Sequence, residues 1–346
     1  MRPPAAVRGM ALALGAVGVG LLVLALGLAA SGYDAPAALA ALFRGGFGSA
    51  DAILSGLLPR AVPLILIGLG IGLAFRAGAL NIGAEGQFYA GAIVATWIGL
   101  MLGAWPRPLA VPAVLVAGVV AGMLWVLAPA VLRLRFGVLE VITTLLLNFV
   151  SEALVSWMVQ GPLQEATGVY PQSDPLPLSA RLPQLGGTRL HAGIALVLLL
   201  AGALWVFLRY TLAGFRLRAT GAGLGAARVV GRVRTGRVFG GALLASGGCA
   251  GLAGAMEVSG TTFSLFQNLS PGYGFTGIAV ALLARLDPVA TVGTGLLIAG
   301  LQAGSSAMQR DAGVPAVAVR VVEAAVIIVV LLADLARRRA DRDRTS

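Results

Sequence analysis

The chain contains 346 residues, of which 58% are hydrophobic and 11% are charged, and its formal net charge is +11. Soluble domains contain about 25% charged residues, so this composition excludes an ordinary soluble enzyme. Apolar runs of roughly 20 residues recur along the whole sequence, and each run could cross a bilayer of about 30 Å. We therefore expect an all-α membrane protein with several transmembrane helices.

The hydropathy pattern fits about ten transmembrane helices within a single membrane domain of residues 1–346. Their expected ranges are 9–30, 57–75, 84–104, 109–132, 138–160, 191–208, 238–258, 273–285, 289–308 and 314–334. The eighth range, 273–285, is short for a full crossing, so it predicts a half-helix or a re-entrant segment.

The first apolar run follows two arginines, Arg2 and Arg8, as the apolar part of a secretory signal peptide would. It continues for about 22 residues, whereas a usual signal peptide has an apolar region of about 7–15 residues. We therefore favour a first transmembrane helix that is not cleaved, with a signal peptide as the alternative.

All 25 basic residues are arginines, and the chain contains no lysine. A phosphate-binding loop of the type GxxxxGK[ST] requires a lysine, so an ATPase of that kind would have to be another polypeptide. Cys249 and His191 are the only residues of their types. An internal disulfide and a thiolate metal cluster are therefore excluded, and a histidine-based metal centre or catalytic triad is not expected.

The positions of the arginines predict the orientation, because basic residues are enriched in cytoplasmic loops. Most of them share one side of the membrane when the N-terminus is placed inside. Both termini are then cytoplasmic, with an outer loop at 161–190, an inner loop at 209–237 and a cytoplasmic tail at 335–346. The positive charge thus reflects topology, and no nucleic-acid partner is expected because basic residues are not interleaved with aromatic ones.

The stretch AFRAGALNIGAEGQFYAGA, residues 74–92, places Asn81, Glu85 and Gln87 between two apolar runs. Polar groups are costly in a bilayer and usually face a pathway or a helix partner. Asn81 and Glu85 are four residues apart, so on a helix they would share one face. They could line a translocation pathway, or Asn81 could be the N-cap of the next helix with Glu85 in its first turn.

The range 138–160 carries a polar stripe on an otherwise apolar segment. Its members, at spacings of three or four along one side, are Glu140, Thr144, Asn148, Ser151 and Glu152. Such a stripe suits either a water-lined passage or hydrogen-bonded helix packing. We favour the passage.

Aromatic and polar residues also gather ahead of the range 273–285. Phe263, Phe266, Asn268 and Tyr273 could contact a planar polar solute near the outer mouth of a pathway. Aromatic residues in outer loops also serve as anchors in the membrane interface, and the sequence leaves this alternative open.

The inner loop 209–237 contains seven arginines and no acidic residue. A short helix at 225–230, flanked by glycines and arginines, would lie along the membrane surface. The loop could contact a cytoplasmic protein, or it could rest on anionic lipid.

The spacing G-x-x-x-R-A-x-G-x-x-x-x-A-A-x-x-x-G in this loop resembles the coupling-helix region of permease subunits of ABC importers. The most similar group takes up nucleosides, simple sugars and branched-chain amino acids. The stretches FRAGALNIGAEGQFYAGA, LEVITTLLLNF and GFTGIAVALLARLDP resemble the nucleoside branch of that group. The resemblance covers roughly residues 55–335 and implies a type II ABC importer-like permease.

The resemblance implies a bacterial cytoplasmic (inner) membrane location and several partners. ATP-binding subunits would hold ATP and Mg²⁺ and clasp the loop, and a second, related permease chain and an extracytoplasmic solute-binding protein would complete the transporter. The expected coupling residues are Arg218, Ala219, Gly221, Ala226, Ala227, Arg228 and Gly231. No cofactor or enzymatic activity is expected in this chain itself.

The expected pathway carries a small polar solute, for which nucleosides are preferred and simple sugars are the alternative. The candidate pathway and substrate residues are Asn81, Glu85, Gln87, Glu140, Thr144, Asn148, Glu152, Phe266 and Asn268.

Two other classes of protein compete with this prediction. A transporter driven by an ion gradient could use membrane-embedded acids, for which Glu140, Glu152 and Glu323 are candidates. Arg320 lies three residues before Glu323, and we expect the two to form an ion pair. An integral-membrane enzyme would need acids, histidines or metal ligands clustered at one membrane face, and the sequence offers almost none.

Overall fold

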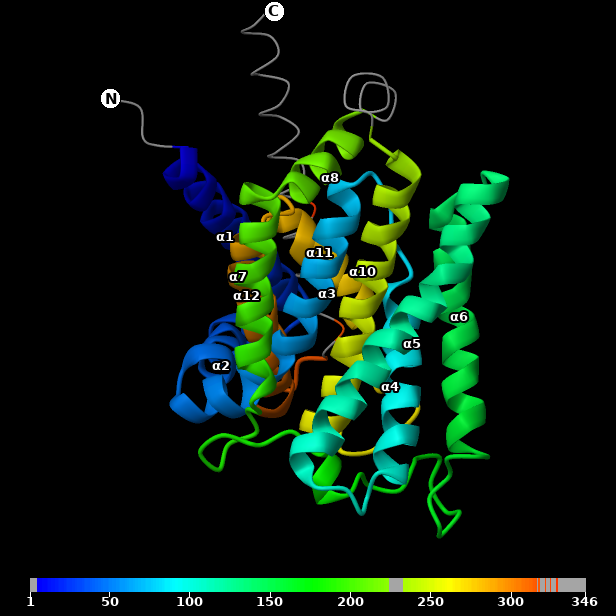
Figure 1. Cartoon of the computed structure of the whole chain (residues 1–346). Coiled ribbons are helices and arrows are strands. Elements are labelled where there is room, and N and C mark those ends of the chain that lie inside the picture. The colour runs from blue at the N-terminus through cyan, green and yellow to red at the C-terminus, as the bar shows by residue number, and fades with distance from the viewer. Residues whose placement is uncertain are drawn as a thin grey trace, which may run out of the picture. The chain divides into compact units, whose positions relative to one another are not determined.

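The computed structural model describes residues 5–223 and 233–315, together with positions 317, 321, 324 and 328. Within these residues the regular elements are helices, and β-structure is limited to two isolated bridges (Figure 1). The described residues fall into two compact units, one within Met1–Arg60 and Leu297–Ser346 and the other within Ala61–Leu296.

The helices of the first unit are α1 (Ala5–Ala30), α2 (Ala35–Phe47) and the π-helix η1 (Ala52–Leu57). The second unit contains α4 (Ala84–Met101), α5 (Arg107–Phe136), α6 (Glu140–Val159), the 3₁₀-helix η2 (Leu178–Ala180), α7 (Gly193–Tyr210), α8 (Leu212–Ala222), α10 (Thr235–Met256), the π-helix η3 (Glu257–Thr262) and α11 (Tyr273–Leu283). Helices α3 (Leu58–Arg76) and α12 (Pro288–Ala312) run from one unit into the other.

Each expected span from 9–30 to 289–308 contains a helix of the structure. Six helical segments among the described residues are long and apolar enough to cross a membrane: Ala52–Arg76, Arg107–Phe136, Glu140–Val159, Gly193–Tyr210, Thr235–Thr262 and Pro288–Ala312. Helix α11 has 11 residues and is therefore about 16 Å long, which confirms the short eighth segment. The count of about ten spans remains a prediction, because most of 314–334, including Arg320 and Glu323, lies outside the described residues.

Helices α4, α5 and α10 form the core of the second unit, and glycines allow their backbones to approach closely. A methyl group built on Gly251 of α10 would lie 2.9 Å from the Cα atom of Gly122 in α5, and it would overlap the carbonyl of Gly118. Gly91 of α4 packs on the backbone of the same residue, Gly251. Small residues at helix crossings are typical of membrane bundles, where close packing takes the place of the hydrophobic effect between helices.

In the first unit, α2 packs on the part of α12 that begins at Leu297. Gly45 and Gly46 of α2 face Ala307 and Gly300 so closely that an added methyl group would overlap them. Asp34 caps the start of α2, since its carboxylate accepts a hydrogen bond of 3.0 Å from the amide of Ala37. The sequence did not predict α2, because 13 residues are too few to cross a bilayer.

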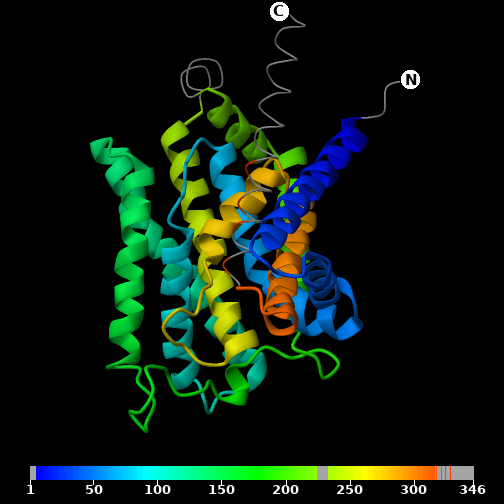
Figure 2. The ribbon, with the colours of Figure 1, turned by 180° about the vertical axis from the view of Figure 1, so that it is seen from behind.

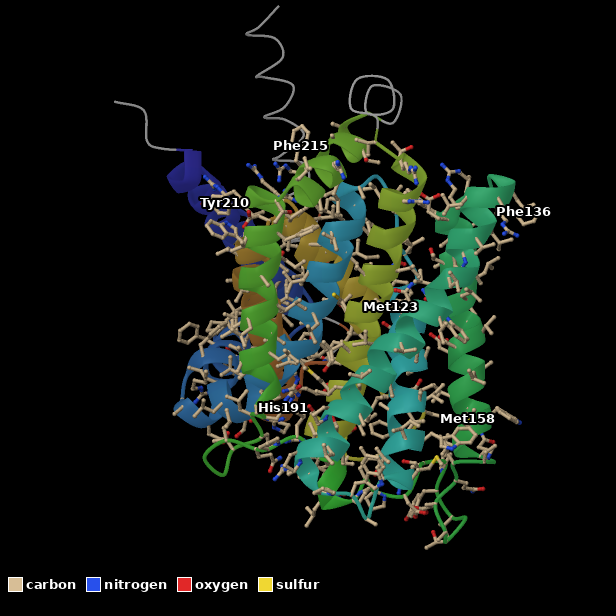
Figure 3. The ribbon with its side chains drawn as sticks, viewed as in Figure 1. Met123, Phe136, Met158, His191, Tyr210 and Phe215 are labelled. Atoms are coloured by element: carbon tan, nitrogen blue, oxygen red, sulfur yellow. The ribbon has the colours of Figure 1, made fainter. Side chains whose placement is uncertain are left out.

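The connections between the long helices of the second unit gather at two opposite ends of these helices (Figures 1 and 2). Helix α8 lies at one end, where Tyr210, Phe215 and Phe136 are found (Figure 3). The connection between α6 and α7 lies at the other end, beside Met158 and His191. This connection is tied to the segment after α10, because the amides of Ser173, Leu176 and Leu182 donate to the carbonyls of Leu265, Phe263 and Ser259 at 2.7–2.8 Å.

Candidate functional site

Three buried polar side chains from α10 and the region around the start of α4 form a closed cluster, consisting of Asn81, Gln87 and Ser246. The amides of Asn81 and Gln87 pair reciprocally at 2.8 and 2.9 Å, and the Asn81 amide nitrogen also donates to the Ser246 hydroxyl at 2.9 Å. Each of the three side chains is at most 1% exposed. Their hydrogen bonds are therefore made within the protein, and the cluster joins the α3–α4 connection to α10.

Asn81 neither lies on a helix with Glu85 nor is the N-cap of α4, so both of these predictions are wrong. Helix α4 begins at Ala84 with Gly83 as its N-cap, so Asn81 precedes the helix and does not share a helix face with Glu85. The side-chain oxygen Oδ1 of Asn81 accepts a hydrogen bond from the backbone amide of Gly83 at 3.0 Å. Asparagine favours such local turns, which compete with helix formation. Glu85 does lie in the first turn of α4, as predicted.

Two members of the polar stripe on α6, Thr144 and Asn148, contact the connection between α3 and α4 and the first turn of α4. The Asn148 side chain accepts from the amide of Gly86 at 2.8 Å and donates to the carbonyl of Ile82 at 3.0 Å. The Thr144 hydroxyl donates to the carbonyl of Glu140 at 2.7 Å and accepts from the amide of Ile82 at 3.3 Å. Thr144 and Asn148 thus take part in helix packing, the alternative to a water-lined passage.

Glu140 lies at the first position of α6, where its carboxylate has two partners. It forms an ion pair of 3.1 Å with Arg133 in the last turn of α5, and it accepts from the amide of Leu80 at 3.4 Å. Gly137, with a φ of 70°, supplies the left-handed turn between the two helices. Glu140 therefore fixes the α5–α6 connection against the segment before α4.

Glu85 connects the first turn of α4 to the first turn of α11. Its buried carboxylate accepts a hydrogen bond of 2.5 Å from the amide of Gly274 and a second from the side chain of Ser270. A carboxylate is stabilised at a helix N-terminus by the amides that have no partner inside the helix. Glu85 is thus an N-terminal anchor for the short helix α11.

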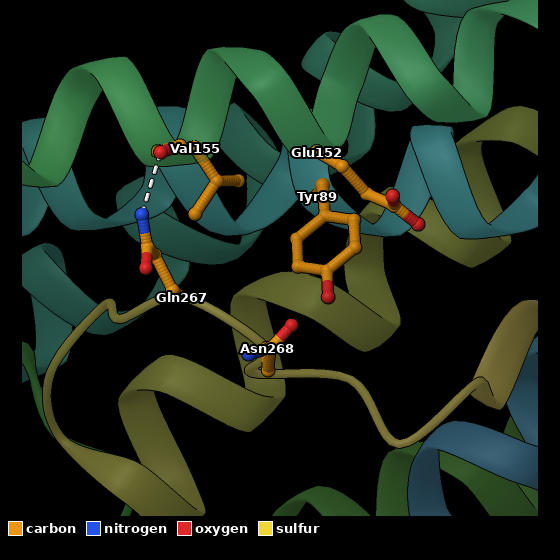
Figure 4. Close-up of a pocket in the computed structure, with 6 residues that line it drawn as sticks. Tyr89, Glu152, Val155, Gln267 and Asn268 are labelled. Carbon is orange, nitrogen blue, oxygen red and sulfur yellow. Dashed lines mark hydrogen bonds between the residues drawn. The ribbon is translucent and has the colours of Figure 1, made fainter.

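One helical turn beyond Glu85, a cavity of about 210 Å³ opens between α4, α6 and the segment before α11 (Figure 4). Its lining residues are Tyr89, Glu152, Val155, Ser156, Gln267 and Asn268. The Gln267 amide donates to the Ser156 hydroxyl at 2.5 Å, and the Tyr89 hydroxyl accepts from the amide of Ser270 at 3.3 Å. Glu152 and Asn268 are exposed, so a carboxylate, an amide and an aromatic ring face one cavity.

The backbone of Asn268 has a φ of 59°, in the left-handed region that asparagine tolerates better than most residues. Phe266, two residues earlier, forms a β-bridge with Gln172 of the α6–α7 connection and does not line the cavity. Phe263 lies under the guanidinium of Arg181 at 4.6 Å from the ring centre. Of the residues expected near a solute, the structure brings Glu152 and Asn268 together.

The α6–α7 connection contains two groups whose pKa is lower than the ordinary value. Hydrogen bonds from Gln172, Thr167 and Tyr170 hold the pKa of the partly exposed Glu165 carboxyl below its ordinary value. Burial lowers the pKa of His191 to about 4, and its Nδ1 accepts from the amide of Gly193 at 3.2 Å. The His191 ring is 1% exposed and packs against Gly260 of the π-helix η3. His191 is thus a neutral packing residue.

Part of the expected coupling region is described. Arg218, Ala219 and Gly221 belong to α8, which the sequence did not predict, and Gly221 packs directly on the carbonyl of Arg76. The other coupling residues, Ala226, Ala227, Arg228 and Gly231, lie outside the described residues, as does the expected helix at 225–230.

Sequence reasoning missed Tyr89, Gln267, Ser246 and Ser270. Tyr89 lies one turn after Glu85, so helix spacing would have found it. Gln267 directly precedes Asn268 in a turn outside the helices, so only its adjacency to a named residue points to it. Ser246 is a single serine in a helix of alanines and glycines, and nothing in its neighbourhood marks it.

The comparisons with known proteins agree on one family. The family described as branched-chain amino acid transport system / permease component matches residues 53–331. A glucose ABC transporter permease protein of Haloferax volcanii is 37% identical over 296 residues, which is 82% of this chain and 77% of the relative. No solved structure matches the chain.

Two further relatives are named for nucleosides. A guanosine ABC transporter permease protein of Bacillus subtilis is 36% identical, covering 90% of this chain and 92% of the relative. A nucleoside ABC transporter permease protein of Lactococcus lactis is 30% identical, covering 90% and 88%. The chain therefore belongs to the branched-chain amino acid transport system / permease component family and is a permease subunit of an ABC transporter.

Proposed function

We propose that this permease subunit forms the translocation pathway of an importer for nucleosides. The observation that carries the proposal is the cavity in which Tyr89, Glu152 and Asn268 face one another. A carboxylate can accept hydrogen bonds from ribose hydroxyls, an amide can pair with the edge of a base, and an aromatic ring offers a face for stacking. The nucleoside names of two relatives support the same solute class.

A simple sugar is the second candidate, and the 37% identity to a glucose permease favours it. A sugar offers hydroxyl groups to Glu152 but no planar base to Tyr89. The aromatic ring and the amides in the same cavity are the reason for preferring a nucleoside.

The importer would contain further subunits. The cavity of about 210 Å³ is below the range of roughly 300–1,000 Å³ typical of small-molecule sites, which suits a pathway completed by a second permease chain. The guanosine permease of B. subtilis has a counterpart from the same organism, also named a guanosine permease, that is 27% identical to this chain. A solute-binding protein would deliver the nucleoside from outside the cell.

ATP and Mg²⁺ would be held by separate ATP-binding subunits, which contact the loop around α8 and residues 224–231. The chain would lie in the bacterial cytoplasmic membrane, with about ten spans, both termini inside and the α8 end toward the cytoplasm. The arginines of 209–237 support this orientation, and those that follow α8 could pair with acidic groups on the ATP-binding subunits. Because the chain belongs to a family of ABC transporter permeases, an ion gradient is not needed to explain how transport is driven.

The solute can be tested by uptake in cells that lack their own nucleoside uptake and express the complete transporter. Accumulation of labelled guanosine that excess unlabelled adenosine suppresses, and that excess glucose does not, is the expected result. Accumulation of glucose without accumulation of guanosine would show that the solute is a sugar and not a nucleoside.

The cavity is tested in the same cells with Glu152→Gln, which removes the charge, and Tyr89→Leu, which removes the aromatic ring. We expect each variant to lower guanosine uptake about tenfold at equal amounts of protein in the membrane, since a hydrogen bond to a charged group and an aromatic stacking contact each contribute on the order of 1.5 kcal/mol. Asp51→Asn is the matched control, because this exposed carboxylate is outside the cavity. Unchanged uptake in both cavity variants would show that the solute passes elsewhere.

The subunits are tested by purifying the tagged chain from its native membrane in mild detergent and identifying stoichiometric partners by mass spectrometry. We expect an ATPase and a second permease. Replacing Ala226 and Ala227 by leucine should release the ATPase and retain the second permease. Failure to recover an ATPase in several detergents would contradict the proposed coupling.

A further inference from the structure

A second polar cavity lies at the α8 end of the second unit, away from the cavity described above. It has a volume of about 220 Å³ and lies between the ends of α3 and α7, helix α8 and the turn before α12. Its lining residues are Arg76, Trp205, Leu208, Arg209, Arg218, Asp287 and Pro288. Three guanidinium groups and a single carboxylate therefore share a small space.

The carboxylate of this cavity is already engaged by backbone amides. One oxygen of Asp287 accepts hydrogen bonds of 3.0 Å from both Val289 and Ala290, so Asp287 caps the start of α12. This position suits a carboxylate, because the first amides of a helix have no partner within it. The carboxylate of Asp287 therefore caps α12 and also faces the arginines of the cavity. Its single negative charge can balance at most one of the three guanidinium groups.

The arginines have few acceptors of their own among the described residues. The Nε atom of Arg76 donates to the carbonyl of Leu286 at 2.9 Å. The guanidinium of Arg209 lies 5.7 Å from the centre of the Trp205 ring, and neither it nor that of Arg218 donates a hydrogen bond to a described residue. The cavity therefore presents a positive charge with unused donors.

Exposed apolar side chains lie beside the cavity. Tyr210, Leu212 and Phe215 are 68%, 62% and 58% exposed, and they flank the arginines along the end of α7 and on α8. Figure 3 shows Tyr210 and Phe215 at this end of the second unit. Tyrosine and tryptophan gather at the level of lipid headgroups, and the Trp205 and Tyr210 rings meet edge to face at 5.6 Å. The cavity thus has the features of the headgroup level of a membrane.

We propose that this cavity binds the phosphate group of an anionic phospholipid. Guanidinium groups bind phosphate through paired, charge-assisted hydrogen bonds, and basic pockets between transmembrane helices hold anionic headgroups. The exposed apolar side chains beside it would contact the acyl chains of the same lipid. A cavity of about 220 Å³ is smaller than a usual small-molecule site, which suits a phosphate with its first glycerol atoms better than a whole soluble metabolite.

The proposal is tested by native mass spectrometry of the full-length chain, purified in detergent with any subunits that accompany it. Phosphatidylglycerol and phosphatidylcholine are titrated in parallel, and we expect retained adducts of phosphatidylglycerol in excess of phosphatidylcholine. Arg218→Gln should weaken phosphatidylglycerol binding about fivefold, the effect of removing one arginine near a charged membrane surface. Arg209→Gln provides the same test at a more exposed residue, should the first variant fail to fold.

Arg135→Gln is the matched control, because Arg135 is exposed in the last turn of α5 and does not line the cavity. Equal weakening by this control, or equal binding of the two lipids, would overturn the proposal. A parallel titration with inorganic phosphate at millimolar concentration distinguishes the sources. Phosphate adducts that depend on Arg218, without selective phosphatidylglycerol adducts, would identify a soluble anion as the ligand and overturn the lipid assignment.

Discussion

The closed cluster of Asn81, Gln87 and Ser246 and the cavity of Tyr89, Glu152 and Asn268 each include one residue of α4, but their polar groups have different partners. In the closed cluster the amide groups bind one another and a serine, and no side chain is more than 1% exposed. In the cavity Glu152 and Asn268 are exposed and face an open space. The first arrangement joins helices, whereas the second can accept a solute.

This difference teaches that a polar residue in a transmembrane helix is not by itself evidence of a pathway. The stripe on α6 divides along its length, since Thr144 and Asn148 bind the backbone before and within α4 and Glu152 lines the cavity. Buried polar groups with complete hydrogen bonding support a unique packing. The partner of each group, and not its polarity, indicates its role.

The largest effect should come from the glycine crossing that holds both regions in place. Gly251→Val would force a side chain into the backbone of α5 at Gly118 and Gly122, and inserted atoms that have no space to move into cost at least about 1–3 kcal/mol in a packed core. We expect little or no folded protein, measured as the monodisperse fraction in fluorescence-detected size-exclusion chromatography.

Gly241→Val is the control for this prediction. Gly241 is also in α10, but no atom lies within 4 Å of an added methyl group there. Both substitutions lower glycine content and add the same side chain to one helix. Equal losses of folded protein would mean that helix propensity and not the crossing is responsible.

The next largest effect should come from the closed cluster. Asn81→Leu and Gln87→Leu each leave a buried amide without its partner, which costs about 1–3 kcal/mol. The double variant removes both amides, so its loss of stability should be smaller than the sum of the two single losses. Thermal unfolding in detergent measures these differences, and strict additivity would contradict a direct coupling of the two amides.

An amide facing the cavity should behave differently. Asn268→Gly keeps a residue that accepts the left-handed backbone at φ 59°, and it removes a side chain that has no buried partner. We expect its melting temperature to match that of the unmodified protein. A loss as large as that of Asn81→Leu would erase the distinction between the two regions.

The sequence predicted the positions of the long helices, because a bilayer requires backbone hydrogen bonds to be satisfied within each crossing segment. It did not predict α2 or α8. Helix α8 contains two arginines within 11 residues and resembles a polar loop in composition, but the packing of Gly221 on the end of α3 gives it a fixed place. Such contacts depend on the folded arrangement and leave no periodic signal.

The candidate site was predictable at the level of residue type only. The low charge of the chain marked Glu85, Asn148 and Glu152 as costly groups that need a reason to be in the membrane. Their partners lie 62 residues away for Asn148 and 189 residues away for Glu85. Without those partners, helix packing and pathway lining are indistinguishable.

The third effect concerns His191, another buried polar group with an internal partner. Burial lowers its pKa to about 4 from an ordinary 6.5, so below pH 6.5 the unfolded chain binds a proton that the folded protein does not. Stability should therefore be complete above pH 6.5 and decrease as the pH falls toward 4, by about 2 kcal/mol at pH 5. His191→Asn should remove this part of the pH dependence of the melting temperature. The same slope in the variant would assign it to other groups.

Among the buried groups, the smallest effect on stability, and the most informative one for the comparison, should come from Glu85, which lies between the two regions. Glu85→Gln keeps an oxygen that can accept from Gly274 and removes the charge at the start of α11, so a loss of about 1 kcal/mol is expected. The adjoining Ser270 also holds the Tyr89 hydroxyl through its backbone amide. A change at Glu85 therefore reaches the cavity, and we expect assembly to be preserved while guanosine uptake changes. Unchanged uptake with lowered stability would place Glu85 with the closed cluster, as a residue that joins helices and has no part in the pathway.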